Sequence, residues 1–417
     1  MLEKSNRERL RDLAKELRDY SLDPLNDEHK RVWKAVNDRK MIRPAVLVRD
    51  YPRYLISIGD EVRQSIEDPF WGAIEYDLQS RIYEWKHMRC DQVIEAEIYC
   101  PAQIVDTRFG ISISAADSML GVNDVYDRAI HYDRIIDSEE DLNKISYANI
   151  EYDEKTTLEH YDVMQDVFEG ILDVKIHGID FFHFAPWDDL LSWMGLEEGL
   201  YDFVLNPELM HKAIRRYLDV SVSRAKRYEE LGLVSSNNRN IPVGAGGYGY
   251  CSDLAGPTES GIGSRLIDNW ADGCDQIMTS VSPAMSREFG FDYEKEWASL
   301  FGLSYFGCCE ILSNKTREAQ ILPNLRKISM SPFADHEDGM SKIKEQVVIS
   351  LKPNPIHLAT TPWDRDALRK ELISACESAR KYGCSMEIVM KTIITLDGDP
   401  KRLWEWSEMA IDIAMNY

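Results

Sequence analysis

The chain has 417 residues, of which 44% are hydrophobic and 10% aromatic, so it can bury a large core and reads as a globular protein. Its formal net charge of −23 disfavours nucleic acid and anionic membranes as partners, and a highly anionic small substrate unless basic groups are concentrated locally. No apolar stretch approaches the ~20 residues of a membrane helix and no signal-peptide core follows Met1. We therefore expect a cytoplasmic protein with its eight cysteines reduced.

The first 90 residues predict an N-terminal helical extension. Leucines at helical spacing, with charges elsewhere, predict helices over residues 6–17 and 27–39, and a further helix is expected over residues 75–89. Residues 44–48 have a strand-like composition. Because this run precedes the regular alternation of strands and helices, we assign it to the extension as well.

From residue 91 to the C-terminus, short apolar runs alternate with helical patterns, such as the charged helix expected at 207–231. Strands are predicted at residues 92–99, 179–184, 240–243, 276–281, 304–310, 325–331, 346–351 and 386–390. Residues 101–155 are acidic and turn-rich, and are interpreted as an inserted lobe or lid. Strands separated by helices favour a parallel sheet, so we predict an α/β protein with a (β/α)₈ TIM barrel; a doubly wound open sheet is the alternative.

The run at residues 304–310 ends on Cys308, Cys309 and Glu310. Thiols beside a carboxylate at a strand end indicate a metal or a nucleophile. Because side chains alternate along a strand, we expect Cys309 and Glu310 to line the cavity at the carboxyl ends of the strands, with Cys308 turned away. Two small buried hydrophobic cysteines are the alternative.

A glycine-rich loop at residues 244–249 follows one predicted strand. Glycines allow the backbone to approach a ligand closely, which makes Tyr248, Cys251 and Asp253 candidate substrate contacts. The loop matches neither a dinucleotide fingerprint nor a phosphate loop. A purely conformational role for these glycines is equally open.

Other candidates lie near strand ends. Glu97 is nearer the carboxyl end of its strand than Glu95 and is a candidate catalytic carboxylate, with an ion pair as the alternative. Lys352 and Lys391 end two successive strands, where a lysine can neutralise an anion or take part in acid–base chemistry. His183 and, in the turn after Lys352, Asn354 are candidate substrate contacts.

An ordered series of segments resembles the uroporphyrinogen decarboxylase superfamily, and more narrowly its corrinoid-dependent methyltransferase (O-demethylase) branch. These segments are residues 187–202, 206–211, 281–285, 301–310, 323–332, 352–355 and 400–406. The resemblance runs from about residue 90 to the C-terminus, so residues 91–417 are expected to form the barrel. It implies transfer of a methyl group from a small methoxylated or methylated compound to the cobalt of a separate corrinoid protein.

The resemblance also implies a cofactor and roles for residues. Cys309 matches a zinc-binding cysteine of related methyltransferases, whereas Gly307 stands where their histidine would be. Zinc on Cys309 and Glu310 is therefore implied, with another ligand from Cys251, Asp253 or Glu97. From their positions at strand ends, Glu310, Glu97 and Lys391 are the expected catalytic residues.

The expected partners are a small methylated substrate and a corrinoid protein carrying cobalamin, with a homodimer as a possible assembly. The chain has no Asp-x-His-x-x-Gly motif, so it should not retain cobalamin by itself. A barrel that binds a ligand or partner without turnover is one alternative. A decarboxylase of the uroporphyrinogen type is another, but the Arg-rich N-terminal motif ending in Gly-Arg is absent.

Overall fold

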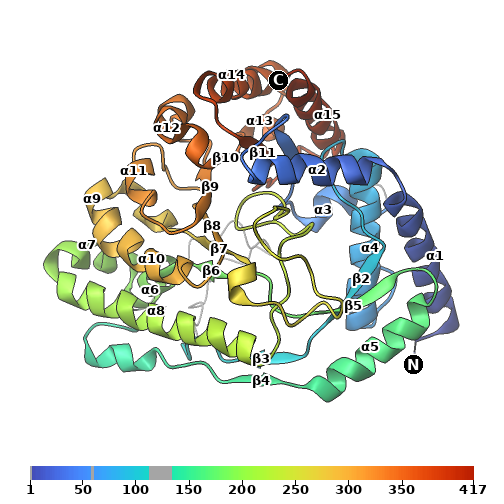
Figure 1. Ribbon diagram of the computed structural model, residues 1–417, viewed down its shortest axis with the longest axis horizontal. Helices are drawn as coiled ribbons and strands as arrows, with labels where there is room; N and C mark the ends of the chain where they lie inside the picture. Colours follow the sequence, from blue (N-terminus) through green and yellow to red (C-terminus); the bar gives the residue numbers. More distant parts are fainter. Residues whose placement is uncertain (1, 58–60, 112–133) are drawn as a thin grey trace.

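The computed structural model describes residues 2–57, 61–111 and 134–417. Its main sheet has seven parallel strands in the order β1-β11-β10-β9-β8-β7-β6. Their bounds are β1 Ala45–Val48, β6 His183–Phe184, β7 Trp270–Gly273, β8 Leu303–Phe306, β9 Leu325–Met330, β10 Val348–Leu351 and β11 Met386–Met390. Neighbours from β7 to β11 are consecutive in the chain, and helices separate them along the outer side of the sheet (Figure 1).

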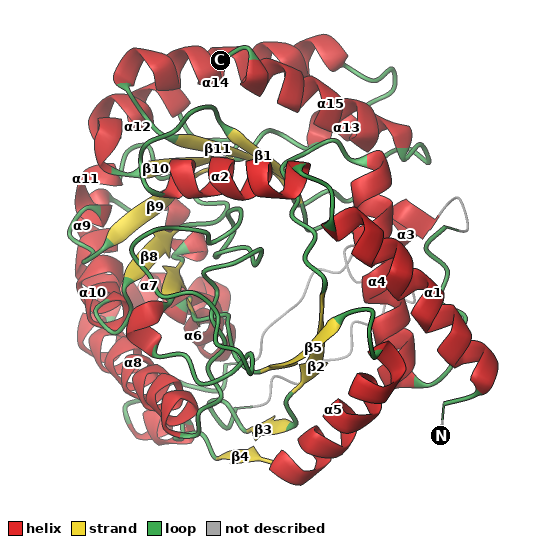
Figure 2. Cartoon of the chain, turned by 45° about the vertical axis from the view of Figure 1, so that its right-hand side comes forward, coloured by secondary structure: helices red, strands yellow, loops and turns green. Residues whose placement is uncertain are grey.

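Among the described residues, four more strands lie outside the main sheet. β2 (Glu97–Pro101) pairs in parallel with β5 (Asp173–His177), and β3 (Ile104–Asp106) pairs antiparallel with β4 (Ile150–Tyr152). Figure 2 shows β2 and β5 across the centre of the molecule from β8 and β9. The α/β class with a parallel sheet is confirmed, whereas closure into an eight-stranded barrel stays a prediction.

The helices cover most of the chain between the strands. They are α1 Lys4–Ser21, α2 Leu25–Asn37, α3 Arg53–Ile56, α4 Pro69–His87, α5 Glu154–Phe168, α6 Pro186–Met194, α7 Leu196–Leu205, α8 Pro207–Glu230, α9 Pro283–Ser286, α10 Asp292–Ala298, α11 Thr316–Ala319, α12 His336–Ile343, α13 Ile356–Ala359, α14 Arg365–Tyr382 and α15 Lys401–Met415. Shorter turns are η3 Glu140–Lys144, η4 Leu266–Asp268, η5 Gln276–Ser280, η6 Arg287–Phe291 and η7 Lys344–Gln346. Among the described residues, none of these helices is long and apolar enough to cross a membrane.

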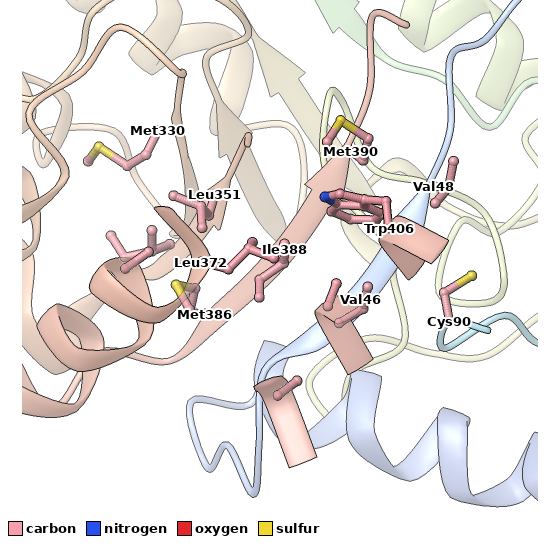
Figure 3. Close-up of a cluster of buried hydrophobic side chains, with 14 of the residues drawn as sticks. Val46, Val48, Cys90, Met330, Leu351, Leu372, Met386, Ile388, Met390 and Trp406 are labelled. Atoms are coloured by element: carbon pink, nitrogen blue, oxygen red, sulfur yellow. The ribbon is translucent and has the colours of Figure 1, made fainter. Parts of the chain in front are cut away.

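The largest core lies between the sheet and the C-terminal helices. Val46 on β1, Leu351 on β10 and Ile388 on β11 meet Leu372 of α14 and Trp406 of α15 (Figure 3). All five are fully buried. Strands of a parallel sheet are covered on both faces, which explains why β8, β10 and β11 are buried along their whole length and read as continuous apolar runs.

The strand at residues 44–48 is present, but its assignment to the N-terminal extension is wrong. As β1 it pairs in parallel with β11, with Ala45 opposite Glu387 and Val48 opposite Met390. The first strand in chain order thus pairs with the last strand in chain order. The local sequence does not encode this long-range pairing. The division of the chain at residue 90 otherwise stays a prediction.

Three further strand predictions are wrong in place or kind. The strand expected at residues 92–99 starts only at Glu97 and pairs with β5 rather than with the main sheet. Residues 240–243 form one isolated bridge, between Pro242 and Tyr248. Residues 276–280 form η5, a 3₁₀ helix, because a run this short has no period to separate helix from strand.

The strand actually used next to β8 is β7, whose sequence Trp-Ala-Asp-Gly has low strand propensity. The strands predicted around residues 304–310, 325–331, 346–351 and 386–390 are confirmed as β8 to β11, and that at 179–184 survives only as the short β6. Of the lobe predicted at residues 101–155, β3, η3 and β4 are seen, and residues 112–133 lie outside the described residues.

Candidate functional site

A cavity of about 450 Å³ opens where four neighbouring strands end. Each strand supplies residues from just beyond its last position: β8 supplies Cys308 and Cys309, β9 Phe333, β10 Lys352 and β11 Lys391. Prolines and aliphatic side chains from the turns after β9, β10 and β11 complete the walls. Because the carboxyl ends of parallel strands meet at one edge, functional groups far apart in sequence converge here.

Gly307 sets the direction of the two cysteines. Its φ of +99° belongs to the left-handed region, and its N–H donates to Gly273 O at 2.8 Å. A Cβ at this position would lie 3.0 Å from Ser329 Cβ, so the turn needs glycine. The alternation of side chains therefore stops before Cys308, and the prediction that Cys308 turns away from the cavity is wrong: both cysteines line it.

The thiols form a small polar group with a lysine. Cys308 Sγ lies 3.6 Å from Cys309 Sγ and 3.3 Å from Lys391 Nζ. Hydrogen bonds from Cys274 and Cys309, together with the charge of Lys391, outweigh burial and lower the pKa of Cys308. The pKa of Cys309 is raised, first because its S–H donates to Cys308. The arrangement favours a thiolate on Cys308.

Lys352 lies at the floor of the cavity and is only 2% exposed. Its ammonium donates to Ser350 O at 3.1 Å and to Ser350 Oγ, and it lies 5.7 Å from the centre of the Tyr305 ring. Burial lowers the pKa of Lys352 to about 7, against the attraction of Glu387. At neutral pH this lysine therefore exchanges a proton readily.

Glu387 lies behind Lys352 and is linked to it through Ser350. It accepts from Lys327 Nζ at 2.7 Å, from Gly247 N at 2.9 Å and from Ser350 Oγ, and both charged side chains are fully buried. A Cβ at Gly247 would lie 2.2 Å from the Trp33 ring, so the glycine loop packs too closely against its neighbours to carry a side chain at this position. The loop thus has a conformational role, supporting Glu387 through its backbone.

Glu310 does not line the cavity. It is 1% exposed and accepts from Cys308 N at 2.6 Å and Asp275 N at 3.2 Å, so its carboxylate holds the turn after β8. Next to it, neither carboxylate oxygen of the buried Asp275 has a hydrogen-bond partner among the described residues, nor does Glu294 Oε1. Burial and mutual repulsion raise the pKa values of Asp275 and Glu294 well above the usual range.

Of the other predicted site residues, Lys391 and Asn354 line the cavity, whereas Glu97, Tyr248, Cys251, Asp253 and His183 do not. Glu97 accepts from Tyr99 O–H at 2.5 Å on β2. Tyr248 packs on Trp33, and Cys251 is buried beside Asn238. Asp253 pairs with Arg326 at 2.6 Å, at the start of β9 and therefore at the opposite end of the strands.

His183 lines a second cavity, of about 750 Å³, between β6 and α8. Its Nδ1 lies 2.5 Å from Asp272 Oδ2. Burial would lower the pKa of His183, but the charge of Asp272 raises it to about 9. Near neutral pH the His183 imidazolium therefore forms an ion pair with Asp272.

Sequence reasoning missed three features of the main cavity: the inward orientation of Cys308, the contribution of Cys274, and the aromatic wall at Phe333. The position of Lys352 at a strand end was the available signal for its role. Cys274 carried no such signal, since β7 was itself not recognised.

The residues described do not present a ready zinc site. Both oxygens of Glu310 are occupied by backbone N–H groups, and among the described residues no three His, Cys, Asp or Glu side chains are arranged to hold a metal ion. Cys251 and Asp253 lie away from Cys309, as the contacts above show. Zinc therefore stays a prediction, and no chemical step is assigned to it.

No protein-family model matches this chain, and no curated protein matches it. A solved structure of a methyltransferase from Methanosarcina mazei is similar in fold, with 12% identity and a TM-score of 0.46. The similarity covers 91% of this chain and 98% of that one. A likeness of this degree identifies neither the family nor the activity of the chain.

Proposed function

We propose that this chain is a methyltransferase, built on a (β/α)₈ barrel, that removes a methyl group from a small methoxylated or methylated compound and passes it to the cobalt of a corrinoid protein. The observation that carries the proposal is Lys352, a buried lysine with a pKa of about 7 at the floor of an open, largely apolar cavity. The sequence resemblance to corrinoid-dependent methyltransferases supports the same chemistry.

Demethylation needs a proton donor because an alkoxide is a poor leaving group. An ammonium near the ether oxygen can protonate it as the bond to the methyl carbon breaks. The place of Lys352 in the cavity wall and its proton affinity suit that role, and Glu387 holds its partner Ser350 in place by a hydrogen bond. Reduced cobalt on the corrinoid protein would be the nucleophile that accepts the methyl group.

The rim of the cavity suits the approach of a second protein. Phe333, Ile356 and Ile394 line the cavity and are 70%, 58% and 51% exposed. Large exposed apolar side chains grouped around a cavity are typical of interaction sites. This chain is strongly negative, so it offers no general electrostatic attraction to an acidic or neutral partner. Apolar contacts at the rim would let a corrinoid protein dock without such attraction.

The test is methyl transfer to added cob(I)alamin or to a corrinoid protein, followed by the absorbance change of the corrinoid, with methoxyaromatics and methylamines as donors. Lys352→Met should lower kcat by about 10²- to 10⁴-fold, the usual contribution of a positioned proton donor. In the wild type, kcat should fall as pH rises through about 7, because the protonated lysine is the active form.

Lys155→Met, at an exposed position far from the cavity in the sequence, is the matched control and should keep full activity. If no donor methylates cob(I)alamin, the alternative of a binding barrel without turnover holds instead. Retained activity in Lys352→Met would remove the proposed role of this lysine.

A further inference from the structure

The cavity differs in charge from the rest of the molecule. The chain carries 72 acidic and 49 basic residues, yet the described residues that line this cavity include two lysines and no aspartate or glutamate. Its other walls are apolar or neutral: Pro332, Phe333, Pro353, Pro355, Ile356, Ala359 and Ile394 are the apolar members. Basic groups are thus concentrated in one place on an acidic protein.

We propose that this cavity binds a small apolar anion, a carboxylate or phenolate on an aromatic or aliphatic body, and that the methyl donor belongs to this class rather than to the methylammonium compounds. The second half of the inference rests on the proposed function; the anion site itself does not. A volume of about 450 Å³ is in the range of small-molecule sites and accommodates a single aromatic ring with its substituents.

The hydrogen bonds of Lys352 leave a place for the anion. An ammonium has three N–H donors, and those of Lys352 that have partners among the described residues go to the two oxygens of Ser350. No carboxylate contacts this ammonium directly, because Glu387 bonds to Lys327 and Ser350 instead. A ligand carboxylate can therefore complete the coordination of a buried charge that the protein leaves open. For the same ammonium to protonate a methyl donor, the ether oxygen must lie beside that carboxylate and share its N–H.

Lys391 provides the second positive group. Its Nζ lies 3.3 Å from Cys308 Sγ and 3.6 Å from Asp50 Oδ2, and Asp50 does not line the cavity. Cys308 offsets part of the charge of Lys391, so Lys352 should be the main partner of the anion and Lys391 the lesser one. A cationic ligand would face the ammonium of Lys391 and the partly protonated Lys352 without a carboxylate in the cavity wall, which is unfavourable.

The inference has a pH signature. The charged or titratable groups that face Lys352 are Glu387, Lys327, Lys391, Cys308 and, through its ring, Tyr305. Since Lys352 is only partly protonated at neutral pH, an anion that binds beside it should take up a proton from solution. Affinity should then weaken as pH rises above about 7.

Calorimetric titration of the whole protein with benzoate, benzyl alcohol and benzylamine tests the charge preference without any methyl donor. Benzoate should bind at least about tenfold more tightly than benzylammonium, since a hydrogen bond to a charged group commonly contributes about that much or more. Proton uptake on benzoate binding, measured in buffers of different ionisation enthalpy, should be positive at pH 7.

Lys352→Met should weaken benzoate binding by about 10- to 100-fold and leave the binding of benzyl alcohol nearly unchanged. Lys391→Met should weaken benzoate binding less. Lys155→Met, the control, should not change it. Equal binding of benzylammonium and benzoate, or benzoate binding that survives both cavity substitutions, would overturn the anion site. Benzoate binding without methyl transfer from any donor would leave the anion site standing and remove the methyltransferase proposal. Methyl transfer from methylammonium without benzoate binding would do the reverse.

Discussion

Two clusters of buried charged side chains in this molecule differ in how charge is balanced. The lysine–glutamate cluster combines opposite charges: it consists of Lys327, Ser350, Lys352 and Glu387. Burial alone would raise the pKa of Glu387, but the charges of the two lysines lower it. In the carboxylate cluster, Asp275 and Glu294 lie near Glu310, and burial is the first cause that raises all three pKa values. Repulsion from neighbouring carboxylates raises those of Asp275 and Glu294 further, and the charge of Cys308 raises that of Glu310. The same degree of burial thus produces opposite protonation behaviour.

The difference indicates that the two clusters have different protonation behaviour near neutral pH. Opposite charges give the lysine–glutamate cluster a fixed arrangement near pH 7 and leave one lysine, at the cavity, free to exchange protons. Like charges make the carboxylate cluster hold protons that exposed carboxylates would release. Two substitutions would break or sharpen this comparison, and a third tests the exposed rim of the cavity next to the lysine–glutamate cluster.

Glu387→Gln should have the largest effect. It leaves Lys327, fully buried, without its counter-charge, and breaking such a pair by removing one partner typically costs about 3–5 kcal/mol. Urea unfolding followed by circular dichroism measures the change in the free energy of unfolding. The double variant Lys327→Met, Glu387→Gln should recover part of the loss; a single variant as stable as the wild type would show that the pair is not the main constraint.

Asp275→Asn should act mainly on the pH dependence of stability. The folded-state pKa of Asp275 is raised, so its contribution is fully present below the unfolded pKa of about 3.9 and is lost as pH rises through the folded value. This contribution should therefore be lost as pH rises above about 4, and the variant should lose less stability over that range than the wild type. Glu377→Gln, at an exposed site, should keep the wild-type slope; an unchanged slope in Asp275→Asn would contradict the assignment.

Phe333→Ser should have the smallest effect on the fold. The side chain is 70% exposed, and substitutions at such positions usually change stability by no more than about 0.5 kcal/mol. On the proposed function, transfer to a corrinoid protein should slow in this variant, while transfer to free cob(I)alamin changes less, because only a protein partner would contact the rim. Equal effects on both acceptors would argue against docking at Phe333.

The sequence by itself determined the local part of this protein. Continuous apolar runs closed by polar or turn residues predicted β8 to β11, and helical spacing predicted α1, α2 and α8, because buried parallel strands and amphipathic helices leave a period in the chain. The same runs placed Cys309, Asn354 and Lys391 at strand ends, and the structure brings these three to one cavity.

Only the tertiary structure decided the rest. The pairing of β1 with β11, the burial of Glu310 on backbone N–H groups and the inward turn of Cys308 depend on contacts between distant segments or on the φ of Gly307. Lys352 owes its lowered pKa to burial and to the charges of Lys391 and Lys327, which no local pattern around residue 352 contains. Sequence spacing fixes which residues can reach a strand end, but long-range packing decides their environment, and the environment sets the chemistry.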